Sequence, residues 1–261
     1  VNSQIIHIPD SLDPGVGLWR GGRGANITAT YSMRGFGISI TASSLSGMAY
    51  QSQRNAGVFD SWINYLPPTS VLQTYVLSQL YPYATQPNGE NSYRADLFYN
   101  FKRKSALGGK YGTKIELSYT HVMAPQITPL NDLNTTRKGI EMDLFHPGDQ
   151  LYYSDFNARI TKRLSKKFDA ILFYQNIAYD NTIIQGAYDY NNIPENGMIY
   201  SDLFVFEGNV KLNKKHNIRF EAQALFTKQH VQDWAAGLIE YTVSPHWFAT
   251  VIDQWNYGNA D

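Results

Sequence analysis

Charged and amide side chains recur at every second residue along several stretches of the chain. In an extended strand every second side chain points to the same face, so each stretch builds a polar row on one side. The rows contain Arg94, Asp96 and Asn100; Lys114 and Glu116; Asp155, Arg159 and Arg163; and Arg219 and Glu221. Such rows can line a water-filled lumen and determine which solutes pass. Alternatively, their mixed charges can pair across strands and only solvate the interior.

One histidine lies close in sequence to several carboxylates. His146 is near Asp143, Asp149 and Asp155, and such a group could bind a metal or take part in acid–base catalysis. The sequence has neither a Gly-x-Ser-x-Gly nor an HExxH motif, which removes two common signatures of hydrolases. We therefore expect no enzyme activity, no metal and no cofactor. A hydrolase with its site at the rim of the long loops is kept as an alternative.

The composition excludes several classes of protein. The 22 basic and 22 acidic residues give a net charge of +0, whereas nucleic-acid binding needs a basic surface, so no nucleic-acid partner is expected. The absence of cysteine removes disulfides, thiolate metal sites and cysteine nucleophiles. No apolar run approaches the length of a membrane-spanning helix. The 19 tyrosines and 13 phenylalanines suit aromatic girdles at the rims of a barrel.

Amphipathic strands must carry the polar rows. Apolar and polar residues alternate strictly through Tyr93–Lys102 and again through Asn217–Thr227, which indicates strands with one apolar and one polar face. Such strands, joined alternately by tight turns and long polar loops, are typical of a transmembrane β-barrel. We predict an all-β, antiparallel up-and-down transmembrane β-barrel with about twelve strands present, each near the length that a tilted strand needs. These strands would form part of a larger barrel.

The spacing of the turns predicts which turns lie on the same side of the membrane. Short turns at 165–167, 213–216 and 244–246 are separated by two strands each, so they share one side, which is periplasmic in bacterial barrels. The 103–112 turn and Pro67-Pro68 lie on the same side as these turns only if residues 124–151 form one long loop on the outer side. The alternation at Ile140–Phe145 then belongs to a hairpin in that loop rather than to a spanning strand.

The boundaries follow from the same pattern. Strands are expected at 57–66 and at Val71–Tyr81, because both stretches alternate. Residues 1–24 are expected to be an irregular lead-in, because Pro14 and a run of glycines interrupt any alternation. The barrel would occupy residues 25–261, with 124–151 and 180–198 as long extracellular loops.

Two unusual strings carry a resemblance to a known family. They are LYPYATQPNGE at 80–90 and EYTVSPHWF at 240–248. Shorter matching strings lie at Tyr31–Gly37, Asn64–Pro67, Leu107–Thr113, Arg219–Glu221 and Asn256–Asn259. With these strings the chain resembles a family of large outer-membrane β-barrels from Bacteroidota whose function is undefined. Members are longer at both ends, so the resemblance implies an internal fragment of a longer protein. It implies a fold and a bacterial outer-membrane location, but no substrate.

Fold and composition together favour a non-enzymatic role in that membrane. The protein would either pass small solutes or be a structural component of an envelope complex. Its partners would be membrane lipid and other outer-membrane or lipoprotein subunits. A rival from another class is a soluble, secreted β-sandwich that binds glycans, because such proteins are also rich in aromatic residues.

Overall fold

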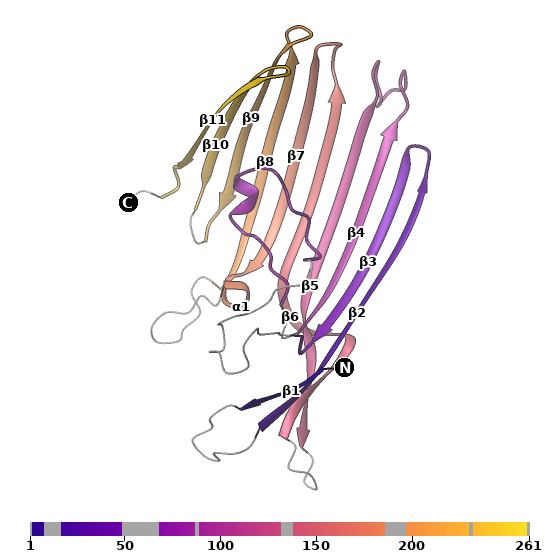
Figure 1. Ribbon diagram of the computed structural model, residues 1–261, viewed down its shortest axis with the longest axis vertical. Coiled ribbons are helices and arrows are strands. Elements are labelled where there is room, and N and C mark those ends of the chain that lie inside the picture. The colour runs from indigo at the N-terminus through magenta and orange to yellow at the C-terminus, as the bar shows by residue number, and fades with distance from the viewer. Residues whose placement is uncertain are drawn as a thin grey trace.

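The computed structural model describes residues 2–7, 17–48, 68–86, 89–131, 138–185, 197–229 and 232–259. In these residues eleven strands form one sheet, and each strand pairs antiparallel with the next one in sequence (Figure 1). The strands are β1 (Asn2–His7), β2 (Gly17–Met33), β3 (Phe36–Ser46), β4 (Gly89–Phe101), β5 (Thr113–Asn131), β6 (Lys138–Arg163), β7 (Phe168–Asp180), β8 (Met198–Lys211), β9 (His216–Thr227), β10 (Trp234–Val243) and β11 (Trp247–Asn256). The prediction of an all-β, antiparallel up-and-down sheet is therefore confirmed, apart from a short parallel pairing of Leu18 and Trp19 in β2 with Lys138 and Gly139 in β6.

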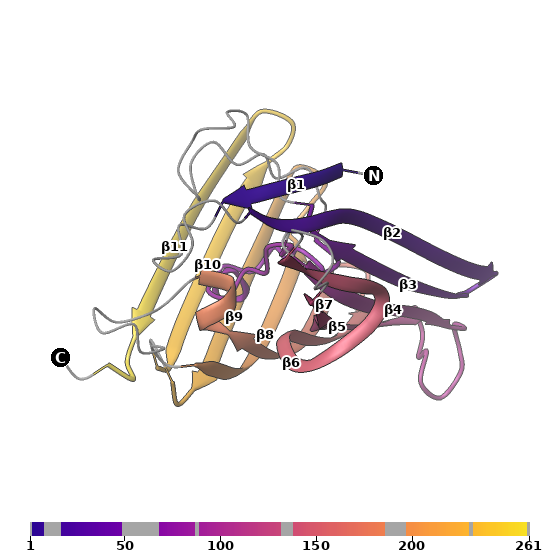
Figure 2. The same ribbon diagram turned by 90° about the horizontal axis from the view of Figure 1, so that it is seen from below.

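The sheet is curved, and it is not closed. No pairing joins β11 to β1 or β2 in the described part of the chain. Figure 2 shows how the strands curl, so that one face of the sheet is concave. No helix in the described residues is long and apolar enough to cross a membrane.

Short and long connections lie at opposite ends of the sheet. The short turns, including 34–35, 164–167, 212–215 and 244–246, gather at one end (Figure 1), as their spacing predicted. Pro68 is different, because the next residue, Thr69, shares a hydrogen bond of 2.7 Å between its Oγ1 and Ser92 Oγ. Ser92 lies near the start of β4, at the long-loop end, so the placement of Pro68 with the short turns was wrong.

Residues 1–24, expected to be an irregular lead-in, and residues 124–151, expected to be a long loop with a hairpin, both contain strands. Residues 1–24 include β1 and the first part of β2, where Asn2–His7 pairs with Gly17–Gly22. Glycines are compatible with this ladder because it is made by backbone groups alone. The range 124–151 lies mostly in β5 and β6, which extend past their neighbours as a paired hairpin (Figure 1). Register shifts between Val122 and Ile127 interrupt the alternation there, which makes these strands hard to recognise in the sequence.

Part of the range 180–198 also has regular secondary structure. Strand β7 ends at Asp180, and a short helix, α1 (Asn181–Gln185), follows directly. Asp180 Oδ1 accepts hydrogen bonds from the backbone N–H groups of Thr182 and Ile183, each at 3.1 Å, which is how a helix N-terminus is capped. Residues 186–196 lie outside the described part.

The strand predicted at Val71–Tyr81 is absent, and the strand at 57–66 lies outside the described residues. Residues 68–86, here called the inner segment, cross the concave face and contain the 3₁₀ helix η1 (Leu77–Gln79) (Figures 1 and 2). Tyr75, Leu77 and Tyr81 of the predicted apolar row are buried, but Ser78 of the opposite row is buried too, because η1 interrupts the extended backbone. The apolar row therefore marks the side of the segment that packs on the sheet, although no strand ladder forms there.

The core lies between the inner segment and the sheet. Its members include Tyr75, Leu77, Phe173, Leu203 and Leu225, all of them buried. Aromatic rings pair across this contact, with centroids 5.0 Å apart for Tyr75 and Phe173. The fold therefore packs a single sheet against a strip of its own chain.

Two leucines of the inner segment test this arrangement. Leu77 is 0% exposed and Leu72 is 76% exposed. We expect Leu77→Ala to lower the free energy of unfolding by about 2–5 kcal/mol, because it leaves a cavity in the core. Leu72→Ala should change it by less than about 0.5 kcal/mol. Denaturant titration measures both, and equal effects would show that the segment does not pack as described.

Candidate functional site

The ten residues of the predicted polar rows all lie on the concave face. Residues directly opposite each other in an antiparallel pair share a face. Asp96 is opposite Ser118, Glu116 is opposite Arg159, and Arg159 is opposite Phe173. The row continues through β8, where Glu207 is opposite Glu221 of β9. Whether this face bounds a closed lumen stays a prediction.

Arg94 joins the sheet to the start of the inner segment. Its Nη2 donates to Asp96 Oδ1 at 2.8 Å, and Ser118 Oγ donates to the same oxygen at 2.8 Å. The Arg94 Nη1 group also donates to the backbone oxygen of Thr69 at 3.3 Å. The charge of Arg94 is thus balanced by Asp96, and the remaining donor holds the segment.

Arg159 holds the middle of the inner segment. Its Nη2 donates to Gln73 Oε1 at 3.3 Å. The guanidinium also stacks over two rings, 5.3 Å from the centroid of Tyr75 and 5.2 Å from that of Phe173. A guanidinium is attracted to the faces of aromatic rings, and the attraction is stronger where water is excluded. Arg159 therefore lies between an aromatic ring of the sheet and one of the segment.

A chain of polar contacts anchors η1 on β8 and β9. Glu207 accepts from Arg219 Nε at 2.9 Å and from the Tyr75 hydroxyl at 3.1 Å. Arg219 also donates to Glu221, whose other oxygen accepts from Gln223 Nε2 at 2.8 Å. Gln223 Oε1 then accepts from the backbone N–H of Leu77 at 3.1 Å.

Tyr75 remains a hydrogen-bond donor over the usual range of pH. Burial, with a smaller contribution from Glu207, raises the pKa of Tyr75 to about 12. The phenol therefore stays protonated at neutral pH and can donate to the Glu207 carboxylate. This bond connects the segment to a side chain more than a hundred residues away.

The other predicted residues lie nearer the end of the sheet that has the short turns. Lys114 and Glu116 form a half-exposed pair at 2.6 Å. Arg163 donates to the backbone oxygens of Ser165 and Lys166 in the turn after β6, so it stabilises a turn. Asn100 is exposed at the end of β4, and it does not join the contacts around the inner segment.

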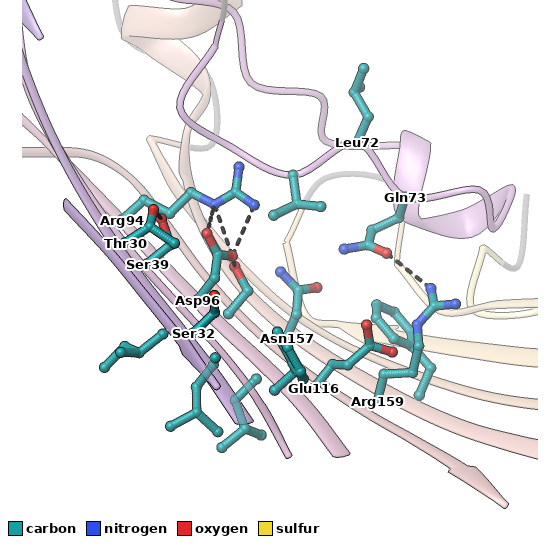
Figure 3. Close-up of a pocket in the computed structure, with 18 residues that line it drawn as sticks. Thr30, Ser32, Ser39, Leu72, Gln73, Arg94, Asp96, Glu116, Asn157 and Arg159 are labelled. Atoms are coloured by element: carbon teal, nitrogen blue, oxygen red, sulfur yellow. Dashed lines mark hydrogen bonds and ion pairs between the residues drawn. The ribbon is translucent and has the colours of Figure 1, made fainter. Parts of the chain in front are cut away.

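A cavity with both apolar and charged walls remains beside the inner segment. It has a volume of about 470 Å³ and lies between Val71–Gln73 and strands β2 to β7 (Figure 3). Arg94, Asp96, Glu116 and Arg159 supply its charges. Both signs are present, with hydroxyl and amide groups between them, so the cavity can hold a small polar solute or water.

Sequence reasoning missed the residues by which the segment is held. Gln73 and Tyr75 lay in a presumed strand, and Gln223 stood two residues beyond Glu221 without being singled out. The period of two did contain a signal for Gln223, since it continues the row of Arg219 and Glu221. No local signal identifies Gln73 as a partner of Arg159.

The histidine and carboxylates near residue 146 are not brought together. His146 and Asp143 are exposed on the far part of β6, while Asp155 is fully buried on the concave face. Within the described ranges no group of three or more His, Cys, Asp or Glu side chains could hold a metal ion.

A single sheet of long amphipathic strands, with a polar concave face that holds part of the same chain, defines an all-β protein of the antiparallel up-and-down class. The chain belongs to DUF6029, a family of unknown function whose model matches residues 11–261. No significant match was found among curated proteins or solved structures.

The contact between Tyr75 and Glu207 can be measured directly. We expect Tyr75→Phe to lower the free energy of unfolding by about 1.5–3 kcal/mol, as for other hydrogen bonds to charged groups. In a double-mutant cycle with Glu207→Ala, the two effects should not add, because each removes the same bond. Additive effects in denaturant titrations would contradict the contact. Tyr31→Phe is the control, because Tyr31 is exposed on the other face.

Proposed function

We propose that this sheet spans a bacterial outer membrane as part of a β-barrel and provides a restricted passage for small solutes. The observation that carries the proposal is the convex face, opposite the inner segment. It exposes large apolar side chains on nearly every long strand. They include Ile27, Tyr31, Ile40, Leu117, Phe156, Ile160, Leu172, Phe204, Phe226 and Ile239. Soluble monomers rarely expose apolar patches of this extent, whereas a barrel turns such a face to lipid.

Strand length supports the same proposal. Strands β3, β4 and β7 to β11 have between 10 and 14 residues, whereas about 9–11 are needed to cross a bilayer at a tilt. Sandwich strands are usually about 5–6 residues long. A sandwich also needs two packed sheets, while the described strands form one. The glycan-binding sandwich is therefore disfavoured.

The ends of the strands fit an outer-membrane orientation. Bacterial barrels have short periplasmic turns and longer outer loops, and the sheet has its short turns at one end. On this proposal the paired ends of β5 and β6 extend to the outside. The resemblance to Bacteroidota outer-membrane barrels supports the same location.

The inner segment determines what kind of passage is proposed. It covers much of the concave face and leaves the cavity of about 470 Å³ with charges of both signs. Such a lumen does not select one sign of ion strongly, and it restricts the size of the solute. No catalytic group is invoked, so the proposed role is non-enzymatic.

A structural role in an envelope complex is the second candidate. The observation that favours it is the same inner segment, because Tyr75, Leu77, Tyr81 and Tyr83 are all buried against the sheet. A lumen that is filled permanently would not conduct. Other outer-membrane or lipoprotein subunits would then be the partners.

Neighbouring residues of β7 test the membrane proposal. Leu172 is 54% exposed on the convex face, and Ile171 lies on the concave face opposite Glu207. Near the bilayer midplane Leu172→Arg should cost about 2–4 kcal/mol, because the charge would lie in lipid. Ile171→Arg can pair with Glu207 and should cost less.

The measurement is the free energy of unfolding of each variant in lipid vesicles. In water an exposed leucine can be replaced by arginine at a cost within about 0.5 kcal/mol. Full tolerance of Leu172→Arg, or a monomer that stays soluble without detergent, would contradict the membrane proposal.

Conductance across a planar bilayer separates the two candidate roles. The complete protein should give small steps, and Tyr75→Ala combined with Leu77→Ala should enlarge them, because both changes loosen the inner segment. Thr74→Ala is the control and should leave the steps unchanged, because Thr74 is an exposed residue of the same segment that is not among those lining the cavity. If both the protein and the loosened variant insert but remain silent, the structural role is favoured.

A further inference from the structure

Arg159 lines the cavity and makes no ion pair in the described part of the chain. The other charged residues of the cavity wall are paired. Arg94 Nε lies 2.8 Å from Asp96 Oδ2. Glu116 Oε1 lies 2.6 Å from Lys114 Nζ. These groups balance one another, so the charge of Arg159 is the one that remains for a ligand.

Most hydrogen-bond donors of Arg159 also have no partner among the described residues. A guanidinium carries five N–H donors in a planar fork. Here only Nη2 donates to a described residue, to Gln73 Oε1 at 3.3 Å (Figure 3). The contacts with the rings of Tyr75 and Phe173 restrict the position of the guanidinium and leave its other N–H groups available. An arginine held in this way is suited to a carboxylate, which accepts two parallel N–H···O bonds.

An aromatic ring forms an apolar part of the same cavity. Phe98 lines the cavity and is 36% exposed. Its ring lies over Gly37, where an added Cβ would collide with it, so this placement requires a glycine. Phe98 is directly opposite Glu116, which is directly opposite Arg159. Ring and guanidinium therefore share a face and lie two strands apart, about 10 Å.

We propose that the cavity binds a small organic monocarboxylate, with its carboxylate against Arg159 and its hydrocarbon part against Phe98. One unpaired guanidinium matches one negative charge, and an apolar wall favours an organic anion over phosphate or chloride. The volume of about 470 Å³ is within the range of small-molecule pockets, about 300–1,000 Å³. Glu116 lies between the two groups, but Lys114 balances its charge.

This inference deepens the proposed passage by naming a class of solute, and it rests on that proposal for the route by which the solute arrives. Because the other charges of the cavity wall are paired, the preference for a negative solute comes from Arg159 alone. Binding to the protein in detergent does not require a conducting pore, so the two proposals are tested separately.

Isothermal titration calorimetry on the complete protein in detergent tests the site. Hexanoate is the probe, acetate shares its charge, and hexan-1-ol shares its hydrocarbon tail. We expect hexanoate to bind at least about tenfold more tightly than acetate, because each buried methylene group strengthens binding about fourfold. Hexan-1-ol should give no heat beyond that measured with detergent alone, because it lacks the charge that pairs with Arg159.

Two variants assign binding to the two parts of the site. Arg159→Gln should abolish the binding of hexanoate, because it removes the cation. Phe98→Ala should weaken the binding of hexanoate and leave that of acetate unchanged, because only hexanoate reaches the ring.

A third variant changes the electrostatics without removing a contact to the ligand. Glu116→Gln should strengthen the binding of hexanoate at least about threefold, because it removes a negative charge directly opposite Arg159. Asp169→Asn is the matched control and should leave the affinity unchanged. Asp169 is a paired carboxylate directly opposite Arg163 on the same face, and it is not among the residues that line the cavity.

Several results would overturn the proposal. Equal affinities for hexanoate and acetate, or binding of hexan-1-ol, would refute the class of ligand. Binding that survives in Arg159→Gln would place the site elsewhere. If Arg159→Gln does not fold, an unchanged affinity in Glu116→Gln decides against the site. Conductance without binding of hexanoate would refute the site and leave the passage, whereas binding to a protein that never conducts would do the reverse.

Discussion

The packing of the inner segment against the concave face is the constraint on which the rest of the structure depends. The described strands form a single curved sheet without a second layer. Its concave face would therefore be exposed to water if the inner segment did not cover it. Tyr75 and Leu77 provide the apolar contact, while Arg159 and Gln223 satisfy polar groups of the segment. Buried polar groups are tolerated only when they are paired, so sheet and segment stabilise each other.

Much of the sheet could be predicted from the sequence, because period-two alternation and turn spacing are local properties. The two-faced strand at Tyr93–Lys102 and the hairpin turns emerged in this way. Local reasoning failed where a long-range contact replaced a strand ladder. The alternation before Tyr81 reports a buried side, and the sequence does not say whether a neighbouring strand or a sheet face provides the burial. Similarly, register shifts near Met123 interrupt the pattern of β5 without ending the strand.

The sequence predicts which face of the sheet carries the candidate site, but not which residues contact each other there. Period two assigns Arg94, Arg159 and Arg219 to one side of the sheet, and their shared face follows from the register. Their partners lie elsewhere in the chain, as Tyr75 does for Glu207. Nothing local to Gln73 indicates that it accepts from Arg159. Composition showed that charges balance, but only the fold shows which charges pair, as Arg219 does with Glu207.

The directions of the edge strands restrict how the sheet can be completed. Residues Ala25–Met33 of β2 lie beyond its pairing with β1 and run toward the short turns, whereas β11 runs away from them. These two edges are therefore antiparallel to each other. Any closure in which all neighbours are antiparallel must either join them directly or insert an even number of strands. Hairpins, which contribute strands in pairs, satisfy this parity, and a single added strand does not.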